Sequence, residues 1–420
     1  MIAFFVRGYN DTDHIAPVVW RMHRDGHTVA VFCLEPDFDL FGDYRIRFLQ
    51  AEGVPVAHAW DDADLLLGLP SRALWRIVNA SFTLARRFSA QGNAILTRLA
   101  RAIGYRWFRR LRASVATADI DRFLRVRGIS LLCFDWVSPS RSIVGPLLAG
   151  AARAGLKSVA LPHGAFLCTN DDIAHAADPA RTIGWRNAIA DPFDHVVVQM
   201  RGFTRFLRDG DANAAKVLVL GSARFCSEWA ARNIAIAPRV LPASAYDDPR
   251  LKCAFIVTRL HYNVDDEAQR AAFTRMAAIP EARVVIKPHT RSSLEAQQYA
   301  GLALEDASDV SSVELCQWAD VVLVIASSVV IEALQQHKVV LYLKYLHTNQ
   351  TLHEEYGDCW VIESEDELAD ALQRLARDRT DVPYARADAE RFLVDVVEGG
   401  VPGRDVLGDH SRALAGLAVR

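Results

Sequence analysis

The stretch Val284-Val285-Ile286-Lys287-Pro288-His289-Thr290 is a short apolar run that stops at polar residues. The same pattern returns in Val321-Val322-Leu323-Val324-Ile325-Ala326-Ser327-Ser328, and a helical segment follows it over 329–334. Each run is typical of a strand that is buried on both faces of a parallel sheet. Polar residues at the carboxyl ends of such strands line the crevice where doubly wound α/β folds bind ligands. The two stretches therefore predict an α/β domain with a ligand site at these strand ends.

The polar residues of both stretches suit an anion. Ser327 and Ser328 stand where a helix begins and offers unpaired backbone N–H groups. Lys287 and His289 add cationic donors from what we expect to be a neighbouring strand. Each pair has a plainer interpretation, as a helix N-cap or as a loop. Taken together, the four residues predict a pocket for the phosphate of a nucleotide.

Length and composition limit the possible classes. The 420 residues predict two domains, each with its own core. A net charge of -3 gives no global attraction to nucleic acid. The seven cysteines form no CxxC pair, which favours buried thiols in a reducing compartment. No apolar run reaches the roughly 20 residues of a membrane span, and Met1 to Arg7 fits a first strand better than a signal peptide. We expect a cytoplasmic protein.

Charge is unevenly distributed along the chain. The segment 65–118 contains no acidic residue, and aromatic residues are interleaved with its arginines. Apolar residues recur there at helical spacing, which predicts a basic amphipathic helical element. It is interpreted as a solvated helical face or as a surface for anionic lipid, with nucleic acid least favoured because no reader motif accompanies it. The arginines are Arg72, Arg76, Arg86, Arg87, Arg98, Arg101, Arg106, Arg109, Arg110 and Arg112.

Strand and helix signals alternate through the first half of the chain. We expect a first domain over 1–210, Rossmann-like, with the basic helical element of 65–118 inserted into it. The expected strands are 2–6, 28–34, 54–57, 129–134, 158–161 and 195–199, and the expected helices include 15–24, 44–51 and 141–154.

The second half repeats this rhythm after a polar stretch at Arg208 to Asp211, so we expect a second Rossmann-like domain over 211–420. Its expected strands are 217–220, 254–257, 284–286, 321–325, 339–343 and 359–362, with a clear helix at 365–377 and more helix after Pro383. Two α/β halves joined by a linker imply a cleft between them.

Further chemistry-bearing residues follow other predicted strands. Asp135 ends the run Cys133-Phe134-Asp135, where an Asp serves as nucleophile, base or simple N-cap. His163 lies in Pro162-His163-Gly164 and suits a general base or a phosphate donor. Arg224 follows the Gly221 turn and is able to pair with phosphate. A structural role in a turn, a cap or a surface ion pair is the alternative for each residue.

Metal and cofactor chemistry find little support. Asp11-Thr12-Asp13 and Asp37-Phe38-Asp39 are DxD strings, which bind divalent ions in some nucleotide-sugar enzymes but also occur by chance in acidic loops. The chain has no HExxH, Walker A or GxGxxG motif, which argues against zinc proteases, P-loop enzymes and typical dinucleotide oxidoreductases. We predict neither a metal site nor a cofactor.

These motifs resemble those of the GT-B glycosyltransferases that use CMP-sugar donors, namely the bacterial capsule and lipopolysaccharide Kdo transferases and the related sialyltransferases. The resemblance rests on Pro162-His163-Gly164, Lys287-Pro288-His289 and Ser327-Ser328. It implies that the second and third motifs hold the CMP phosphate and that Glu332 reaches the ribose hydroxyls. The order Pro288-His289 departs from the His-Pro order of the sialyltransferases. A weaker resemblance, through similar His-Gly, Lys-x-His and Ser-Ser elements, is to the CDP-glycerol glycerophosphotransferases.

The resemblance implies a metal-independent transferase that moves an acidic sugar, Kdo above others, from CMP to a bacterial surface glycan. Asp135 and His163 would be catalytic, and Arg224 would join the donor site. Asp135 would act as a nucleophile if configuration is retained, or as a base if it is inverted. The implied partners are a glycan or glycolipid acceptor and an anionic membrane surface that contacts Arg72 to Arg112, at the inner face of the inner membrane.

Three alternatives remain open from the sequence. The first is a CDP-alditol phosphotransferase of teichoic-type polymers, and the second is a UDP-sugar 2-epimerase. The third is a non-catalytic GT-B scaffold.

Overall fold

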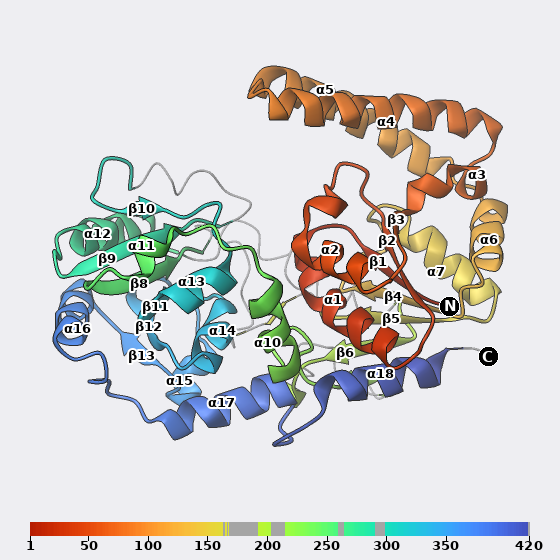
Figure 1. The fold of residues 1–420 in the computed structure, drawn as a ribbon. Coiled ribbons are helices and arrows are strands. Elements are labelled where there is room, and N and C mark those ends of the chain that lie inside the picture. The colour runs from red at the N-terminus through yellow and green to blue at the C-terminus, as the bar shows by residue number, and fades with distance from the viewer. Residues whose placement is uncertain are drawn as a thin grey trace.

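The computed structural model describes residues 1–162, 164–165, 167, 192–202, 215–258, 264–289 and 299–418. They form two α/β domains, each built on one parallel sheet (Figure 1). This confirms the predicted fold class, two Rossmann-like domains with a helical insertion in the first.

The first domain contains a seven-stranded sheet in the order β3-β2-β1-β4-β5-β6-β7, and all pairs are parallel. Apolar runs form its centre, and every residue of β1, β2 and β4 is buried. The strands are β1 (Ile2–Val6), β2 (Val29–Cys33), β3 (Val56–His58), β4 (Leu131–Asp135), β5 (Lys157–Leu161), β6 (His195–Val198) and β7 (Val217–Val219).

One strand does not lie where the sequence suggested. We expected 217–220 to open the second domain, but β7 pairs with β6 at the edge of the first sheet. The second sheet begins only with β8, so the chain leaves the first sheet after β7. Periodicity identifies a strand but carries no information on its partner, and this expectation was therefore wrong.

The second domain contains a six-stranded parallel sheet in the order β10-β9-β8-β11-β12-β13. The strands are β8 (Leu251–Ile256), β9 (Ala282–Lys287), β10 (Glu305–Asp306), β11 (Val321–Val324), β12 (Val339–Leu343) and β13 (Trp360–Ile362). The helices of this domain are α11 (Ala243–Tyr246), α12 (Asp266–Ala277), α13 (Ser312–Trp318), α14 (Val329–Gln335), η5 (Lys344–Leu346), α15 (Leu352–Tyr356) and α16 (Glu365–Arg377).

Helices cover the first sheet and link it to the second. Those before the insertion are α1 (Tyr9–Arg24), η1 (Leu40–Gly42), α2 (Tyr44–Ala51), η2 (Ala59–Asp62) and α3 (Ala63–Leu66). After it come α6 (Thr117–Val126), α7 (Val144–Arg153) and, between the domains, α10 (Ser227–Ile236) (Figure 1).

The basic segment forms a helical hairpin of α4 (Leu69–Ala90) and α5 (Ala94–Ala113), which projects from the first domain at the top of Figure 1. The two helices pack closely, because a Cβ atom on Gly104 would meet the Phe82 ring at 2.9 Å. None of the described helices is both long enough and apolar enough to cross a membrane.

The C-terminal helices α17 (Arg386–Glu398) and α18 (Val406–Leu417) run beneath both domains (Figure 1). The last helix returns to the first domain and packs on α1. Gly221, two residues after β7, allows the end of α17 to pass close to the first domain as the chain returns to it. Its φ is +80°, and a Cβ atom there would lie 2.6 Å from the Val397 carbonyl oxygen.

Candidate functional site

Each sheet reverses its strand order at one point, and ligands of doubly wound folds bind outside the strand ends at such points. In the first sheet the reversal falls between β1, which Arg7 follows directly, and β4, which ends at Asp135. In the second it falls between β8 and β11, and β11 leads into Ser327 and Ser328. A backbone hydrogen bond from Leu352 N–H to Leu167 C=O (2.9 Å) connects the segments that follow β12 and β5.

Asp135 lies at the first reversal point but has no exposed surface. Arg7 donates from Nη2 to Asp135 Oδ2 (2.5 Å) and from Nε to Asp11 Oδ2 (3.1 Å). Burial lowers the pKa of the Arg7 guanidinium, but the two carboxylates outweigh it and raise that pKa overall. Arg7 keeps 19 % of its side chain exposed, whereas Asp135 keeps 1 %. A ligand at this edge therefore meets Arg7 before it meets Asp135.

Arg224 joins the two domains at their junction. Its Nη1 lies 3.3 Å from Asp13 Oδ2 in the first turns of α1, and its Nη2 donates to Glu332 Oε1 (3.1 Å) on α14. The hydroxyl of Ser312 donates to the other oxygen of Glu332 (3.1 Å). Each carboxylate oxygen retains a second lone pair, so Glu332 keeps capacity for a ligand hydroxyl.

A second arginine extends this network into the first domain. Arg45, at the start of α2, is 7 % exposed and pairs with both Asp13 and Asp43. Its Nη2 lies 2.6 Å from Asp43 Oδ2. Asp13 therefore sits between Arg45 and Arg224, and a row of alternating charges connects α2 to α14.

The predicted phosphate residues occupy two separate strand ends. Ser328 is the N-cap residue of α14 without a side-chain capping bond, and Ser327 Oγ accepts from Val329 N–H (3.3 Å). Lys287 ends β9, and its Nζ donates to the Ser308 carbonyl (2.6 Å), while burial lowers its pKa. His289 follows at a half-buried position.

We had expected Lys287 and His289 to come from a strand next to the one that precedes Ser327 and Ser328. The two pairs do not come from neighbouring strands. β8 lies between β9 and β11, so the pairs are two strand spacings apart, about 10 Å. Alternation of strands and helices along the chain reveals which strands exist but not their order in the sheet, and the expectation of neighbouring strands was wrong.

The structure brings together only part of the predicted set. Arg224 and Glu332 are in contact, and Ser327 and Ser328 begin the helix that carries Glu332. Asp135 belongs to a different cluster in the first sheet, and His163 lies outside the described residues.

Sequence reasoning missed three participants, Arg7, Arg45 and Ser312, and considered Asp13 only as part of a DxD string. Arg7 had a usable signal, because a charged residue follows the first buried strand directly.

Three of the four aspartates in the two DxD strings pair with arginines of the protein itself. Asp11 pairs with Arg7, and Asp13 with Arg45 and Arg224. Asp37 pairs with Arg101 and accepts from the Tyr105 hydroxyl (3.3 Å). Asp39 caps η1 by accepting from Gly42 N–H. Arginine thus occupies the positions at which a divalent ion would have to compete.

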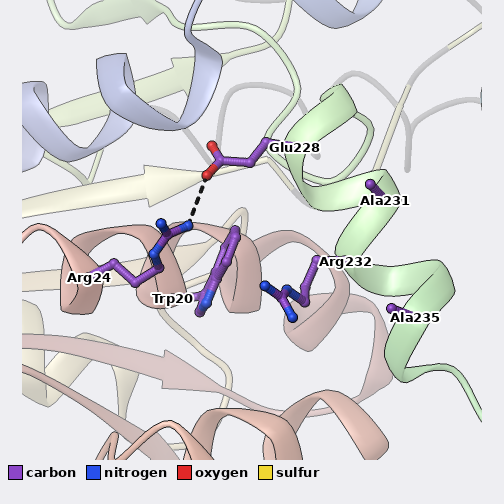
Figure 2. A pocket seen from close by; sticks show the side chains of 6 residues that line it. All are labelled: Trp20, Arg24, Glu228, Ala231, Arg232 and Ala235. Carbon is purple, nitrogen blue, oxygen red and sulfur yellow. Dashed lines mark hydrogen bonds and ion pairs between the residues drawn. The ribbon is translucent and has the colours of Figure 1, made fainter.

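A surface pocket of about 290 Å³ lies between α1 and α10 (Figure 2). Trp20 stands between Arg24 and Arg232, whose guanidinium carbons lie 4.9 and 5.4 Å from its ring centroid. Glu228 pairs with Arg24 at 3.2 Å. Trp20 and Arg24 come from the C-terminal half of α1, whereas Asp11 and Asp13 occupy its first turns. The pocket contains none of the predicted site residues.

No protein-family model matches the chain, and no curated protein matches it in sequence. Solved structures do match over at least 94 % of its length. MnaA of S. aureus in complex with UDP is similar with a TM-score of 0.53 and 12 % identity over 94 % of this chain and 96 % of that one. UDP-GlcNAc 2-epimerase from Neisseria meningitidis, bound to UDP-GlcNAc, gives 0.53 and 12 % over 94 % and 99 %.

A glycosyltransferase is similar to the same extent. SnogD from Streptomyces nogalater gives a TM-score of 0.51 and 13 % identity over 100 % of this chain and 99 % of that one. At such identities the likeness establishes the fold alone. The chain has the two-domain GT-B fold.

Proposed function

We propose that this protein is a glycosyltransferase that moves an acidic sugar, for which we favour Kdo, from CMP to a bacterial surface glycan. The second domain would bind the donor and the first the acceptor. The observation that carries this proposal is the anchored carboxylate of Glu332. Arg224 and Ser312 fix its orientation from two sides, at the start of the helix that Ser327 and Ser328 precede. The Glu332 carboxylate is a fixed hydrogen-bond acceptor that suits the hydroxyls of a ribose. The serine pair beside it suits the phosphate attached to that ribose.

Departure of CMP needs its phosphate charge neutralised, and fixed donors achieve this without reorganisation. Ser327 and Ser328 would donate to the phosphate. Lys287 and His289, two strand spacings away on the far side of β8, would donate to the same phosphate through their side chains. Arg224 would hold Glu332 and, through Asp13, keep the two domains in register for transfer.

The acceptor would bind on the first domain beside exposed aromatic rings. Tyr9, directly beyond β1, is 54 % exposed, and Phe41, beyond β2, is 43 % exposed. Tyr9 is held by an edge contact with Phe38 (4.9 Å between centroids). Such rings offer flat apolar surfaces to a sugar ring, with polar neighbours for its hydroxyls. His163 would assist at the acceptor or the phosphate. Asp135 would be the catalytic carboxylate, beside Arg7 at the carboxyl edge of the first sheet.

A thermal-shift screen of CMP, CDP, UDP, UMP and GDP tests the donor. We expect CMP to raise the melting temperature most, and Glu332→Gln to reduce that rise. A preference for CDP would replace the proposal with the CDP-alditol phosphotransferase. If no nucleotide stabilised the protein, the non-catalytic scaffold would take its place.

A UDP-sugar 2-epimerase is the second candidate, because structures bound to UDP and UDP-GlcNAc match nearly the whole chain. The two readings differ in their product. Incubation with UDP-GlcNAc, followed by NMR of the sugar H2 signal, would reveal an epimer if this candidate is right. An unchanged spectrum together with CMP stabilisation would exclude it.

We expect the transfer to need no metal, since arginines hold the aspartates of one DxD string and Arg101 holds Asp37 of the other. Activity should persist after treatment with EDTA. If EDTA abolished it and Mg²⁺ restored it, Asp37 and Asp39 would become the first residues to replace.

We propose a cytoplasmic protein that associates peripherally with the inner face of the inner membrane, where a lipid-carried acceptor would be presented. Six described cysteines are free and buried, and burial raises the pKa of the thiols of Cys33 and Cys133, which suits a reducing compartment. The region from Arg72 to Arg112 would face the anionic surface. Fractionation of cells with and without a high-salt wash tests this location, and an extracytoplasmic protein would contradict it.

A further inference from the structure

The α4–α5 hairpin has a sealed inner face and a firm base. Phe82 of α4 and Phe108 of α5 are at most 3 % exposed, and Phe108 packs edge-on against Trp60 of the domain at 5.2 Å. Midway along α5, Arg101 Nε lies 3.1 Å from Asp37 Oδ2 of the domain. The hairpin is therefore a rigid projection whose apolar core is already buried between its two helices and the domain.

Its outer face nevertheless exposes large apolar side chains. Of the twelve large apolar residues that are exposed in the described chain, seven lie on this hairpin. Ile95, Leu99 and Ile103 are 79 %, 56 % and 42 % exposed and recur every four residues, so they form one stripe along α5. Ile77 and Leu84 lie two turns apart on α4. Concentrated exposed apolar surface of this kind marks an interaction site.

The charge around the stripe identifies the occupant. The segment 65–118 has ten arginines and no acidic residue. Within the described residues, salt bridges engage two of the ten, Arg72 with Asp64 and Arg101 with Asp37. A second copy of the chain would bring two such arginine-rich faces together without a countercharge. An anionic bilayer supplies both the countercharge and an apolar phase.

We propose that the α4–α5 hairpin is a membrane wedge: Ile95, Leu99 and Ile103 insert among lipid acyl chains while the arginines beside them pair with headgroup phosphates. The inference rests on the proposed peripheral location and adds insertion to it. Electrostatic attraction alone would be lost at high salt, whereas the apolar stripe retains part of the binding because salt does not screen it.

Vesicle binding tests the wedge and needs no substrate. The probes are vesicles of phosphatidylcholine with about 30 % phosphatidylglycerol, and vesicles of phosphatidylcholine alone. The apolar variant combines Ile95→Gln, Leu99→Gln and Ile103→Gln. The matched control combines Val126→Gln, Val240→Gln and Val401→Gln, which are 60 %, 51 % and 52 % exposed elsewhere on the molecule. A third variant replaces Arg106, Arg109, Arg110 and Arg112 with Gln.

We expect the apolar variant to bind anionic vesicles about tenfold or more weakly, and the control to bind like the wild type. The arginine variant should also bind weakly, and no variant should change CMP stabilisation. If the apolar variant bound anionic vesicles as tightly as the wild type, electrostatic attraction would account for all of the binding. That result would overturn the proposed insertion. Equal binding to neutral and anionic vesicles would overturn the role of the arginines.

A second readout separates insertion from self-association. Leu99→Cys, labelled with an environment-sensitive fluorophore, should shift to the blue with anionic vesicles, whereas labelled Val240→Cys should not. A wild-type dimer in light scattering that becomes a monomer in the apolar variant, without vesicle binding, would assign the stripe to a second copy and overturn the wedge. CMP stabilisation that fails while vesicle binding persists would contradict the proposed transferase and leave the wedge standing.

Discussion

Asp135 and Arg7 form a buried pair at the reversal point of the first sheet, so neither is replaced without an effect on the other. We predict that Asp135→Asn abolishes transfer and leaves CMP affinity nearly unchanged, because the donor residues lie on the second sheet. Arg7 retains Asp11, so the free energy of unfolding should fall by only about 1–3 kcal/mol. Activity assays, calorimetry with CMP and urea unfolding measure the three quantities.

Arg7→Gln distinguishes direct from indirect action of Asp135. Loss of transfer in both variants would indicate that Asp135 works by holding Arg7. An active Arg7→Gln beside an inactive Asp135→Asn would return the carboxylate to direct contact with substrate. Full activity in Asp135→Asn would move the search to other carboxylates of the first domain, beginning with Asp171 and Asp172, which lie outside the described residues.

His289 belongs to the proposed donor site. His289→Ala should weaken CMP binding by about 1.5–3 kcal/mol, the range for a charge-assisted hydrogen bond, without a change in the melting temperature of the free protein. Calorimetry measures the affinity. His23→Ala, which removes a surface bond to the Glu52 carbonyl on the first domain, is the control and should bind CMP normally. Equal affinity in all three proteins would remove His289 from the site.

At this scale the sequence located strand-end residues but not their partners. Ser327, Ser328 and Glu332 follow one strand, so their shared helix was predictable. The contact between Arg224 and Glu332 joins residues 108 positions apart, and the contact between Arg7 and Asp135 spans 128. Such contacts depend on strand order and domain packing, which local pattern does not encode.

Among the elements, the turn after β7 is tightly constrained by the backbone of α17. Gly221→Ala should lower the free energy of unfolding by more than about 1 kcal/mol, because alanine disfavours a φ of +80° and its Cβ would meet the Val397 carbonyl. Gly416→Ala is a matched control on α18, with open space around its Cβ position, and should be neutral or slightly stabilising. Urea unfolding compares them. Equal stability of the two variants would contradict the constraint.

Element boundaries followed the strength of the local signal. The helices 44–51 and 365–377 and the strand 339–343 match the prediction, because apolar periodicity and polar ends agree there. β10 escaped notice because it consists of Glu305 and Asp306 at a sheet edge. The first helix begins at Tyr9 and not at residue 15, because Asp11 in its first turn favours an earlier helix start.

Over the whole molecule, two buried histidines should make stability depend on pH. Burial lowers the pKa of His410 to about 4, and burial with the nearby Lys344 lowers that of His347 to about 4. Both bind protons more readily when unfolded, at a pKa of about 6.5. Stability is therefore complete above that value and falls as pH drops towards 4, by about 1.4 kcal/mol per pH unit and group.

Urea unfolding at several pH values between 7 and 4 measures this slope. His410→Asn should remove about half of it, since one of the two groups no longer titrates. A slope unchanged by His410→Asn would show that other groups cause the loss. A stability that rises on acidification would contradict the direction of both pKa shifts.

The return of α18 to the first domain has a consequence for synthesis on the ribosome. Leu407 and Leu414 belong to the same core cluster as Val18 and Trp20, and Asp405 pairs with Arg21 at 3.1 Å. The nascent first domain thus lacks part of its interior until residues 406–417 have been synthesised. Removal of α18 would expose apolar surface on α1, far away in the sequence, and chaperones would meet the defect there.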